Sequence, residues 1–302
     1  MATMDVGIII NPAAGRRYSQ SIHLRTQLAN KVLSAEGIDG EVKLTDGRGS
    51  AHAIAVKMIS SGARTIVAWG GDGTINEVAK ATVDAGITLG VVPGGSGNGF
   101  ARGLGLQIQP RLALKTALTG PIRLIDSGEI DRRLFVNVAG VGFDAHLAGV
   151  FNHLRTRGSW SYLFSGIREL LTYRSSSYTV SCDRQCFTMD AFLVTIANGP
   201  EYGLGAMIAP LARFDDGVLD VISVAPRSPA SLLFQSRRLF SGTIHYLPEV
   251  RFISGAVMEI SADHPLQFHV DGEVYKGTER LLVRVRPSSL SVRVPTVHGG
   301  HK

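Results

Sequence analysis

Apolar runs alternate with amphipathic stretches over the first 125 residues of the chain. Short, nearly continuous apolar runs predict buried strands at 6–10, 41–44, 65–69 and 87–92. Between them, apolar positions at helical spacing predict helices at 19–36, 50–62 and 74–85. This alternation is typical of a parallel sheet with helices on both faces.

The pattern changes near Arg123. Downstream, short alternating stretches separated by Asp-Gly and Gly-Pro turn signals predict an antiparallel sheet or sandwich, with strands at 134–138, 178–182, 191–197, 218–224, 257–261, 266–270, 281–285 and 290–294. Two stretches, 143–173 and 228–241, are expected to be helical. We therefore predict an α/β domain at 1–125 and a β-sandwich domain at 126–287. The pattern leaves open whether a last strand at about 288–296 returns to the first domain.

Composition narrows the class of protein. The chain has 302 residues, enough for two domains, and two cysteines, Cys182 and Cys186, which fit a reducing compartment. It contains no apolar run of transmembrane length and no signal peptide, so we expect a cytoplasmic protein. The net charge of +6 favours an anionic partner such as phosphate, acidic lipid or nucleic acid, without distinguishing among them. No zinc-finger or RNA-recognition signature is present, so no nucleic-acid partner is expected.

Three glycine-containing loops follow predicted strands of the first domain, at 11–17, 70–73 and 93–99. A strand–glycine–helix junction directs backbone N–H groups and the positive end of a helix at one point, which suits phosphate. Because parallel strands end at one edge of a sheet, the loops are expected to meet there and form a nucleotide site.

Asp72 is unusual among these loops, because a carboxylate repels phosphate. It fits if Mg²⁺ bridges the two, or if the acid orients or deprotonates a nucleophile. The alternative is that Asp72 and Thr74 only cap the following helix.

Taken together, the motifs resemble the diacylglycerol kinase catalytic family, which includes bacterial lipid kinases, sphingosine kinases and ceramide kinases. The resemblance rests on segments in the family's order at 11–15, 70–77, 93–98, 137–144, 215–220 and 271–273. It implies a nucleotide domain like that of NAD kinase followed by a β-sandwich. Gly99 stands where several bacterial diacylglycerol kinases carry aspartate, which leaves the identity of the lipid open.

The resemblance also implies ligands and residue roles. ATP would be bound by Asn11, Gly15, Thr45, Gly70, Gly71, Asp72, Gly73, Thr74, Asn76, Ser96 and Asn98. A structural Mg²⁺ would map to Asp216 with the carbonyl groups of Arg213 and Val218. Asp72, Asp271 and Glu273 are the catalytic candidates, with Glu273 the first choice for proton acceptor and Asp271 the alternative.

Each acidic motif also has a plain structural explanation. Asp271-Gly272 and Asp216-Gly217 both fit hairpin turns. In the functional interpretation, a carboxylate at 271–273 takes the proton from a lipid hydroxyl while the γ-phosphate of ATP is in line.

The expected activity is therefore ATP- and Mg²⁺-dependent phosphorylation of a lipid, first diacylglycerol, with a sphingoid base or another lipid alcohol as alternatives. NAD kinase activity and a catalytically idle nucleotide-binding lipid sensor are further alternatives. Basic and aromatic residues at 151–174 and 226–241 suit an anionic phospholipid surface. This predicts peripheral attachment to the inner face of the membrane; the alternative is two ordinary helices covering the sandwich. A homodimer is also left open.

Overall fold

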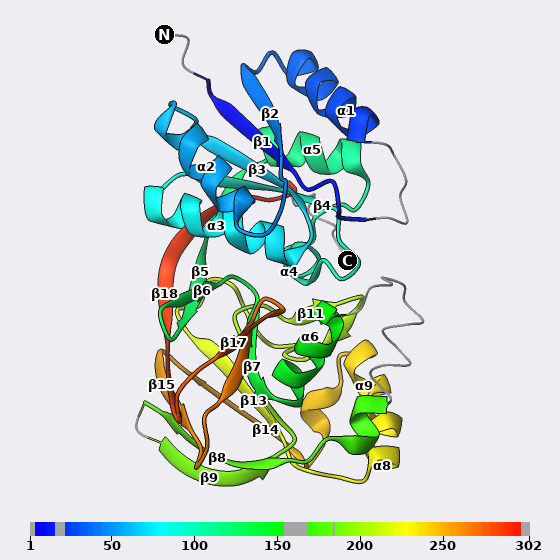
Figure 1. The fold of residues 1–302 in the computed structure, drawn as a ribbon, viewed down its shortest axis with the longest axis vertical. Coiled ribbons are helices and arrows are strands. Elements are labelled where there is room, and N and C mark those ends of the chain that lie inside the picture. The colour runs from blue at the N-terminus through cyan, green and yellow to red at the C-terminus, as the bar shows by residue number, and fades with distance from the viewer. Residues whose placement is uncertain (1–3, 16–21, 154–167, 184, 297–302) are drawn as a thin grey trace. The chain divides into compact units, whose positions relative to one another are not determined.

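The computed structural model describes residues 4–15, 22–153, 168–183 and 185–296 (Figure 1). The chain forms two compact units. Unit 1 comprises residues 1–125 and 288–302, and unit 2 comprises residues 126–287. Two strands run across the boundary in sequence, β5 (Ile122–Ile130) and β18 (Arg280–Arg293).

Unit 1 is a parallel sheet with helices on both faces, as predicted. The strand order is β2-β1-β3-β4-β18, and every neighbouring pair is parallel. Its elements are β1 (Val6–Ile10), α1 (Ile22–Ala35), β2 (Gly40–Leu44), α2 (Ser50–Ser60), β3 (Thr65–Gly70), α3 (Asp72–Ala85), β4 (Thr88–Pro93), α4 (Gly99–Gly103) and α5 (Pro110–Thr119).

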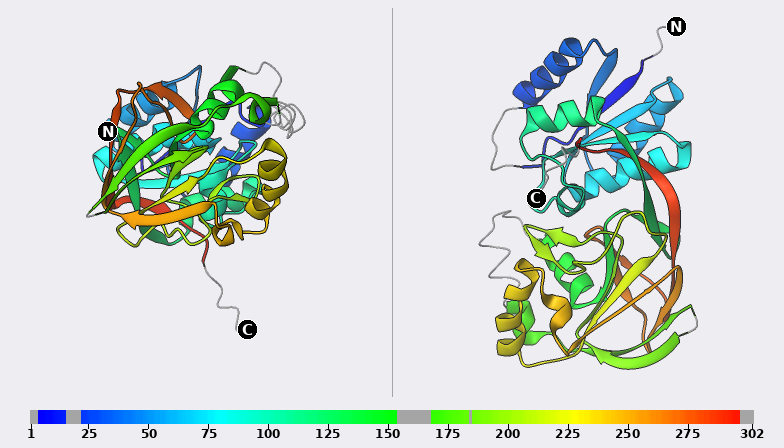
Figure 2. Two further views of the ribbon diagram at one scale, coloured as in Figure 1. Left: turned by 90° about the horizontal axis from the view of Figure 1, so that it is seen from below. Right: turned by 180° about the vertical axis from the view of Figure 1, so that it is seen from behind.

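The strands of unit 1 are apolar throughout because both faces of the sheet are covered. Every residue of β1 and β3 is buried. On one face, Ile8, Trp69 and Val92 pack with Leu33 of α1 and Leu114 of α5. Helices α2 and α3 cover the opposite face (Figures 1 and 2).

The end of the chain completes the sheet of unit 1. β18 is one long strand where the sequence predicted two short ones. Its first half pairs antiparallel with β15 of unit 2. Its second half pairs parallel with β4, with Ser291 opposite Thr88 and Val292 opposite Leu89. The last strand therefore does return to the first domain.

Unit 2 is an antiparallel sandwich, also as predicted. One sheet has the order β14-β13-β10-β7-β16-β17, and the other runs β18-β15-β8-β9. Its strands are β6 (Arg133–Phe135), β7 (Val138–Gly142), β8 (Ser176–Cys182), β9 (Gln185–Ala191), β10 (Leu193–Ala197), β11 (Glu201–Gly203), β12 (Ala206–Met207), β13 (Leu219–Val224), β14 (Val250–Gly255), β15 (Val257–Ser261), β16 (Gln267–Val270) and β17 (Glu273–Lys276).

The core of unit 2 lies between the two sheets. Val141, Val194 and Val221 of the six-stranded sheet pack in one buried cluster with Val180 and Ile260 of the other. The outer face of the six-stranded sheet is also covered, because α6 (Phe143–His153) packs on β7 and β16.

The helical predictions for unit 2 hold only in part. The stretch expected at 143–173 contains α6 and a short helix at 168–172, and residues 154–167 lie outside the described residues. The stretch expected at 228–241 forms two short helices, α8 (Pro229–Gln235) and α9 (Arg237–Phe240), followed by a 3-10 turn, η1 (Ile244–Tyr246). No helix within the described ranges has the length and apolar content needed to cross a bilayer.

Candidate functional site

The predicted nucleotide-site residues of unit 1 gather at the carboxyl edge of the parallel sheet. Asn11 follows β1, and Thr45 follows β2, where its N–H donates to the carbonyl of Ile10 at 3.0 Å. Gly71 follows β3, and Gly94 follows β4. The edge thus carries all three predicted loops, and ligands of open α/β sheets bind at such an edge.

The loops touch one another through backbone. Gly94 N–H donates to the carbonyl of Gly70 at 2.7 Å. A Cβ atom on Gly95 would lie 2.7 Å from the Cα of Gly71, and one on Gly15 would lie 2.5 Å from the carbonyl oxygen of Gly94. Side chains are excluded here by contact between main chains, which leaves a surface of backbone groups that phosphate can approach closely.

Two polar side chains fix the first loop. Asn11 Nδ2 donates to Thr74 Oγ1 at 2.8 Å, which ties the loop to the first turn of α3. Arg25 of α1 is buried and donates to the carbonyl groups of Asn11 at 3.2 Å and Ala14 at 2.8 Å. Burial lowers the pKa of Arg25. We did not predict Arg25, because in sequence it is an ordinary basic residue of an amphipathic helix and belongs to none of the motifs.

Asp72 is the first residue of α3 but not its cap. The N-cap position belongs to Gly71, without a side-chain capping bond. The Asp72 carboxylate instead accepts from the N–H of Phe100 in α4 at 3.3 Å. Asp72 therefore connects the loop at 70–73 to α4, the helix that follows the loop at 93–99.

The other predicted nucleotide-site residues divide into ligand-accessible and structural ones. Ser96 is exposed at the tip of the third loop. Asn98 is buried, and its side-chain amide bonds both the N–H and the carbonyl of Gly95, so it closes the loop on itself. Gly73 and Asn76 lie in the first two turns of α3.

In unit 2, the predicted acidic motifs occur at one end of the six-stranded sheet. The register pairs Ala197 with both Val138 and Asp220, and Val270 with Glu273. The starts of β7, β13 and β17 and the ends of β10 and β16 therefore share that end. The Asp216 turn and the Asp271–Glu273 turn both belong to it.

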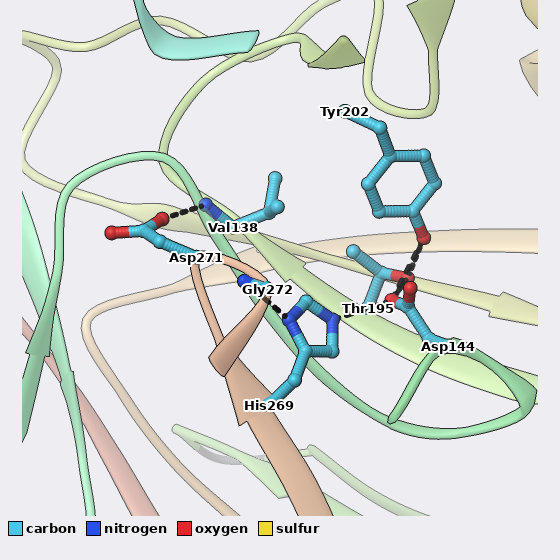
Figure 3. Close-up of polar contacts among 7 residues, drawn as sticks. All are labelled: Val138, Asp144, Thr195, Tyr202, His269, Asp271 and Gly272. Atoms are coloured by element: carbon cyan, nitrogen blue, oxygen red, sulfur yellow. Dashed lines mark hydrogen bonds and ion pairs between the residues drawn. The ribbon is translucent and has the colours of Figure 1, made fainter. Parts of the chain in front are cut away.

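Asp271 and Gly272 form the two-residue turn of the β16–β17 hairpin, with φ angles of 46° and 87°. Both positive values fit the turn interpretation of the sequence. The Asp271 carboxylate is buried and accepts three backbone N–H bonds from residues 136–138, at 2.9 to 3.0 Å. Figure 3 shows the bond from Val138. The carboxylate anchors the turn to the start of β7. Glu273, which follows Gly272, is partly exposed at the start of the edge strand β17.

A buried polar cluster beside this turn was not predicted. Asp144 Oδ2 accepts from Thr195 Oγ1 and from the Tyr202 hydroxyl, each at 2.8 Å. His269 Nε2 lies 3.1 Å from the same oxygen, a charge contact outside regular hydrogen-bond geometry. His269 Nδ1 accepts from Gly272 N–H at 3.3 Å (Figure 3). The signal in the sequence was a histidine inside an otherwise apolar strand.

Burial and the neighbouring Asp144 together shift the pKa values of Tyr202 and His269. Burial raises the pKa of Tyr202, and the Asp144 carboxylate raises it further, so the hydroxyl keeps its proton. Burial lowers the pKa of His269, but the adjacent Asp144 and, to a smaller extent, Asp271 outweigh burial, so that the pKa is raised overall.

The Asp216 turn, predicted to bind Mg²⁺, precedes β13. Asp216 is exposed, and its Oδ1 accepts from Val218 N–H at 3.3 Å, while the buried Asp126 accepts from Gly217 N–H at 2.7 Å. Arg213 Nη2 lies 3.6 Å from Asp215 Oδ1. The turn is therefore not the tip of a hairpin but a loop held by Asp126.

Negative charge accumulates at this loop. Burial raises the pKa of Asp220; a hydrogen bond from Ser254 opposes the rise, and the nearby Asp216 adds to it. Among the described residues no cluster of three or more His, Cys, Asp or Glu side chains could hold a metal. A single carboxylate with backbone carbonyl groups, as predicted at Asp216, would be a different and weaker kind of site.

Both units match known protein families. Residues 5–130 match the diacylglycerol kinase catalytic domain, and residues 137–294 match the YegS C-terminal NAD kinase beta sandwich-like domain. A Klebsiella pneumoniae protein described as "probable lipid kinase YegS-like" is 30% identical over 98% of both chains. A Pseudomonas aeruginosa protein of the same description is 32% identical over 84% of both chains.

Solved structures show the same fold. A diacylglycerol kinase from Bacillus anthracis superimposes with a TM-score of 0.74 at 19% identity, covering 97% of this chain and 98% of the other.

Proposed function

Because this chain belongs to the family of lipid kinases that share the diacylglycerol kinase catalytic domain, we propose that it transfers the γ-phosphate of ATP to a lipid hydroxyl group, with diacylglycerol as the first candidate. The observation that carries the proposal is the convergence of three loops at the carboxyl edge of the unit 1 sheet, where Gly71 and Gly95 meet main chain to main chain. Such a backbone cradle beside the start of α3 is suited to a polyphosphate.

In this proposal, the nucleotide is held mainly by backbone. The first-turn N–H groups of α3 have no intrahelical acceptor and face the phosphate charge. Thr74 and Asn11 orient the first loop toward the same helix start. Asp72, adjacent to this cradle, would bind the phosphates through a cation rather than directly.

The acceptor hydroxyl must lose its proton as its oxygen bonds to the γ-phosphorus and the bond to the ADP oxygen breaks. We assign the proton to Glu273. Asp271 is less suited to this role, since its two carboxylate oxygens already accept three N–H bonds that anchor the turn. The turn then delivers Glu273 at a fixed place.

Mg²⁺ has two proposed places, at the triphosphate near Asp72 and at the Asp216 loop. When bound, the cation at the triphosphate supplies charge neutralisation at the transferring phosphoryl group. At the loop, Asp216 and the carbonyl groups of Arg213 and Val218 would hold an ion that offsets the local negative charge. Its role there would be to order the loop.

The lipid substrate requires a bilayer surface, and we propose that α8, α9 and η1 provide contact with anionic phospholipid. Phe234 and Phe240 are each 62% exposed, and Tyr246 is 72% exposed. The Arg237 guanidinium stacks 3.7 Å from the centroid of the Phe234 ring, and Arg238 follows it. Exposed aromatic rings beside cations suit the headgroup region of an anionic membrane.

Phosphate transfer from γ-labelled ATP tests the activity. The lipid panel would contain diacylglycerol, monoacylglycerol, sphingosine, ceramide and undecaprenol in mixed micelles with Mg²⁺, and NAD would serve as the soluble acceptor. We expect labelled lipid, and a turnover about 10²- to 10⁴-fold lower in Glu273→Gln, the usual loss for a general base. Asp72→Asn should also lose activity.

Matched controls are Glu279→Gln and Asp84→Asn, which change exposed carboxyl groups in the same units. Both should retain wild-type turnover. Label in NAD alone would replace the proposal with NAD kinase activity. ATP binding without any labelled acceptor would favour the idle lipid sensor.

Membrane contact is tested by co-sedimentation with phosphatidylglycerol vesicles at low salt. The double variant Arg237→Glu/Arg238→Glu should bind less. Lys57→Glu/Lys80→Glu, which makes the same charge change on exposed positions of unit 1, is the control. Equal loss in both variants would mean that net charge, not this surface, binds the vesicles.

A further inference from the structure

A row of three residues crosses the outer face of the six-stranded sheet beside the Asp271–Gly272 turn. Gly140 of β7 lies opposite Thr195 of β10 on one side and opposite His269 of β16 on the other. Asp144, at the start of α6, sits directly over the glycine, because a Cβ on Gly140 would lie 2.5 Å from Asp144 Oδ2. The missing side chain of Gly140 makes room for the carboxylate.

Asp144 thereby reaches His269. Its Oδ2 lies 3.1 Å from His269 Nε2 while accepting from Thr195 and Tyr202. His269 is only 3% exposed, so this contact is shielded from water. Nε2 faces the carboxylate, which favours the proton on that nitrogen.

The other ring nitrogen of His269, Nδ1, faces the Asp271–Gly272 turn. His269 Nδ1 lies 3.3 Å from the N–H of Gly272, and since an N–H donates, Nδ1 must accept (Figure 3). With its proton on Nε2, the ring leaves Nδ1 free to accept from Gly272 and places the Nε2 proton beside the Asp144 carboxylate. The turn is thus held at Asp271, by the three N–H groups of residues 136–138 and by its own N–H bond to the Val138 carbonyl, and at Gly272 by His269.

We propose that Asp144 and His269 are positioning residues that orient the Asp271–Gly272 turn and, through it, Glu273. The inference rests on the proposed role of Glu273 as proton acceptor. Neither side chain takes part in the chemistry. They fix the direction in which the chain leaves the turn, and a displacement of about 1 Å in a reacting group can reduce turnover about 10²-fold.

Two amide variants of His269 separate the two contacts. In His269→Asn the side-chain oxygen can take the place of Nδ1 and accept from Gly272. In His269→Gln the amide can take the place of Nε2 and reach Asp144, but the bond to Gly272 is lost. We expect kcat to fall about 10- to 100-fold in His269→Gln and to stay within about threefold of wild type in His269→Asn, with the KM for ATP unchanged in both.

A double variant tests whether the effect passes through Glu273. In a Glu273→Gln background, His269→Gln should cause no further loss, because the group it positions is already gone. The same fold loss in both backgrounds would show a general structural effect and overturn the inference. If Glu273→Gln alone has wild-type turnover, the proposed function of that residue fails instead.

Amide exchange gives a readout that does not depend on activity. The N–H of residue 272 should exchange with deuterium faster in His269→Gln than in wild type, and at a near wild-type rate in His269→Asn. Gly140→Ala, which pushes Asp144 away from its place, should also accelerate it, whereas Gly47→Ala, with open space around its Cβ, should not. Unchanged exchange at 272 in His269→Gln would overturn the inference whatever the enzyme assay shows.

Discussion

Asp271→Ala should destabilise unit 2 as well as reduce activity. The change removes the acceptor of three backbone N–H groups at residues 136–138, all of them buried bonds of 2.9 to 3.0 Å. A buried donor left without an acceptor costs about 1–3 kcal/mol. Because water can reach some of the vacated space, we expect a total of about 3–6 kcal/mol rather than the full sum.

The turn itself complicates the measurement, since alanine is strained at positive φ. Asp131 supplies the control, because it has the same φ of 46° and the same place in a two-residue turn, between β5 and β6. It is exposed, so Asp131→Ala carries the turn strain without the buried anchor. The difference between the two variants measures the anchor.

Urea unfolding followed by circular dichroism gives the free energies of unfolding. For a unit of this size, each kcal/mol shifts Tm by about 2–4 °C, so the anchor corresponds to a shift on the order of 10 °C. Asp271→Asn should be intermediate, because one amide oxygen keeps part of the bonding. If Asp271→Ala costs less than about 1 kcal/mol more than Asp131→Ala, the anchoring role is wrong.

Three further predictions concern other parts of the chain. Gly95→Ala should weaken ATP binding at least about tenfold by calorimetry, because its Cβ would meet the Cα of Gly71 at 2.7 Å and force the loops apart. Glu77→Ala should lower stability by about 1–2 kcal/mol in urea, because the carboxylate accepts two N–H bonds at the start of α2, at 2.7 and 3.0 Å; an unchanged midpoint would contradict this. Burial, with a smaller effect of Asp183, raises the pKa of Cys182. A thiol reagent at pH 8 should therefore label exposed Cys186 in the native protein and Cys182 only after unfolding; equal labelling rates would refute this.

Much of unit 1 was predictable because burial on both faces imposes a simple pattern. β1 and β3 are apolar at every or nearly every position, so their limits could be read to within one residue. Parallel topology then predicts that loops after successive strands share one edge. β9 (Gln185–Ala191) was missed, because as an edge strand it is largely exposed and its polar residues weaken the alternation.

The candidate site in unit 2 was only partly accessible to sequence reasoning. The Asp-Gly pair predicted the turn at Asp271. The hydrogen-bond donors to the Asp271 carboxylate, however, lie more than 130 residues earlier in the chain. The same holds for Asp144 and His269, which meet only after β7 and β16 have paired. From the sequence, the family resemblance made Glu273 the first choice over Asp271, but their different hydrogen bonding becomes visible only in three dimensions.

The second half of β18 determines the order in which the two units can complete their folding during synthesis. The sheet of unit 1 has β18 beside β4, so its first 125 residues leave the ribosome without the strand that covers that edge. All of unit 2 is synthesised before that strand exists. An open parallel edge is a template for pairing with other chains. During translation, the α/β unit therefore either stays incompletely folded or has the exposed edge of β4 covered by another protein. Unit 2 can fold before the sheet of unit 1, which begins earlier in the sequence, is complete.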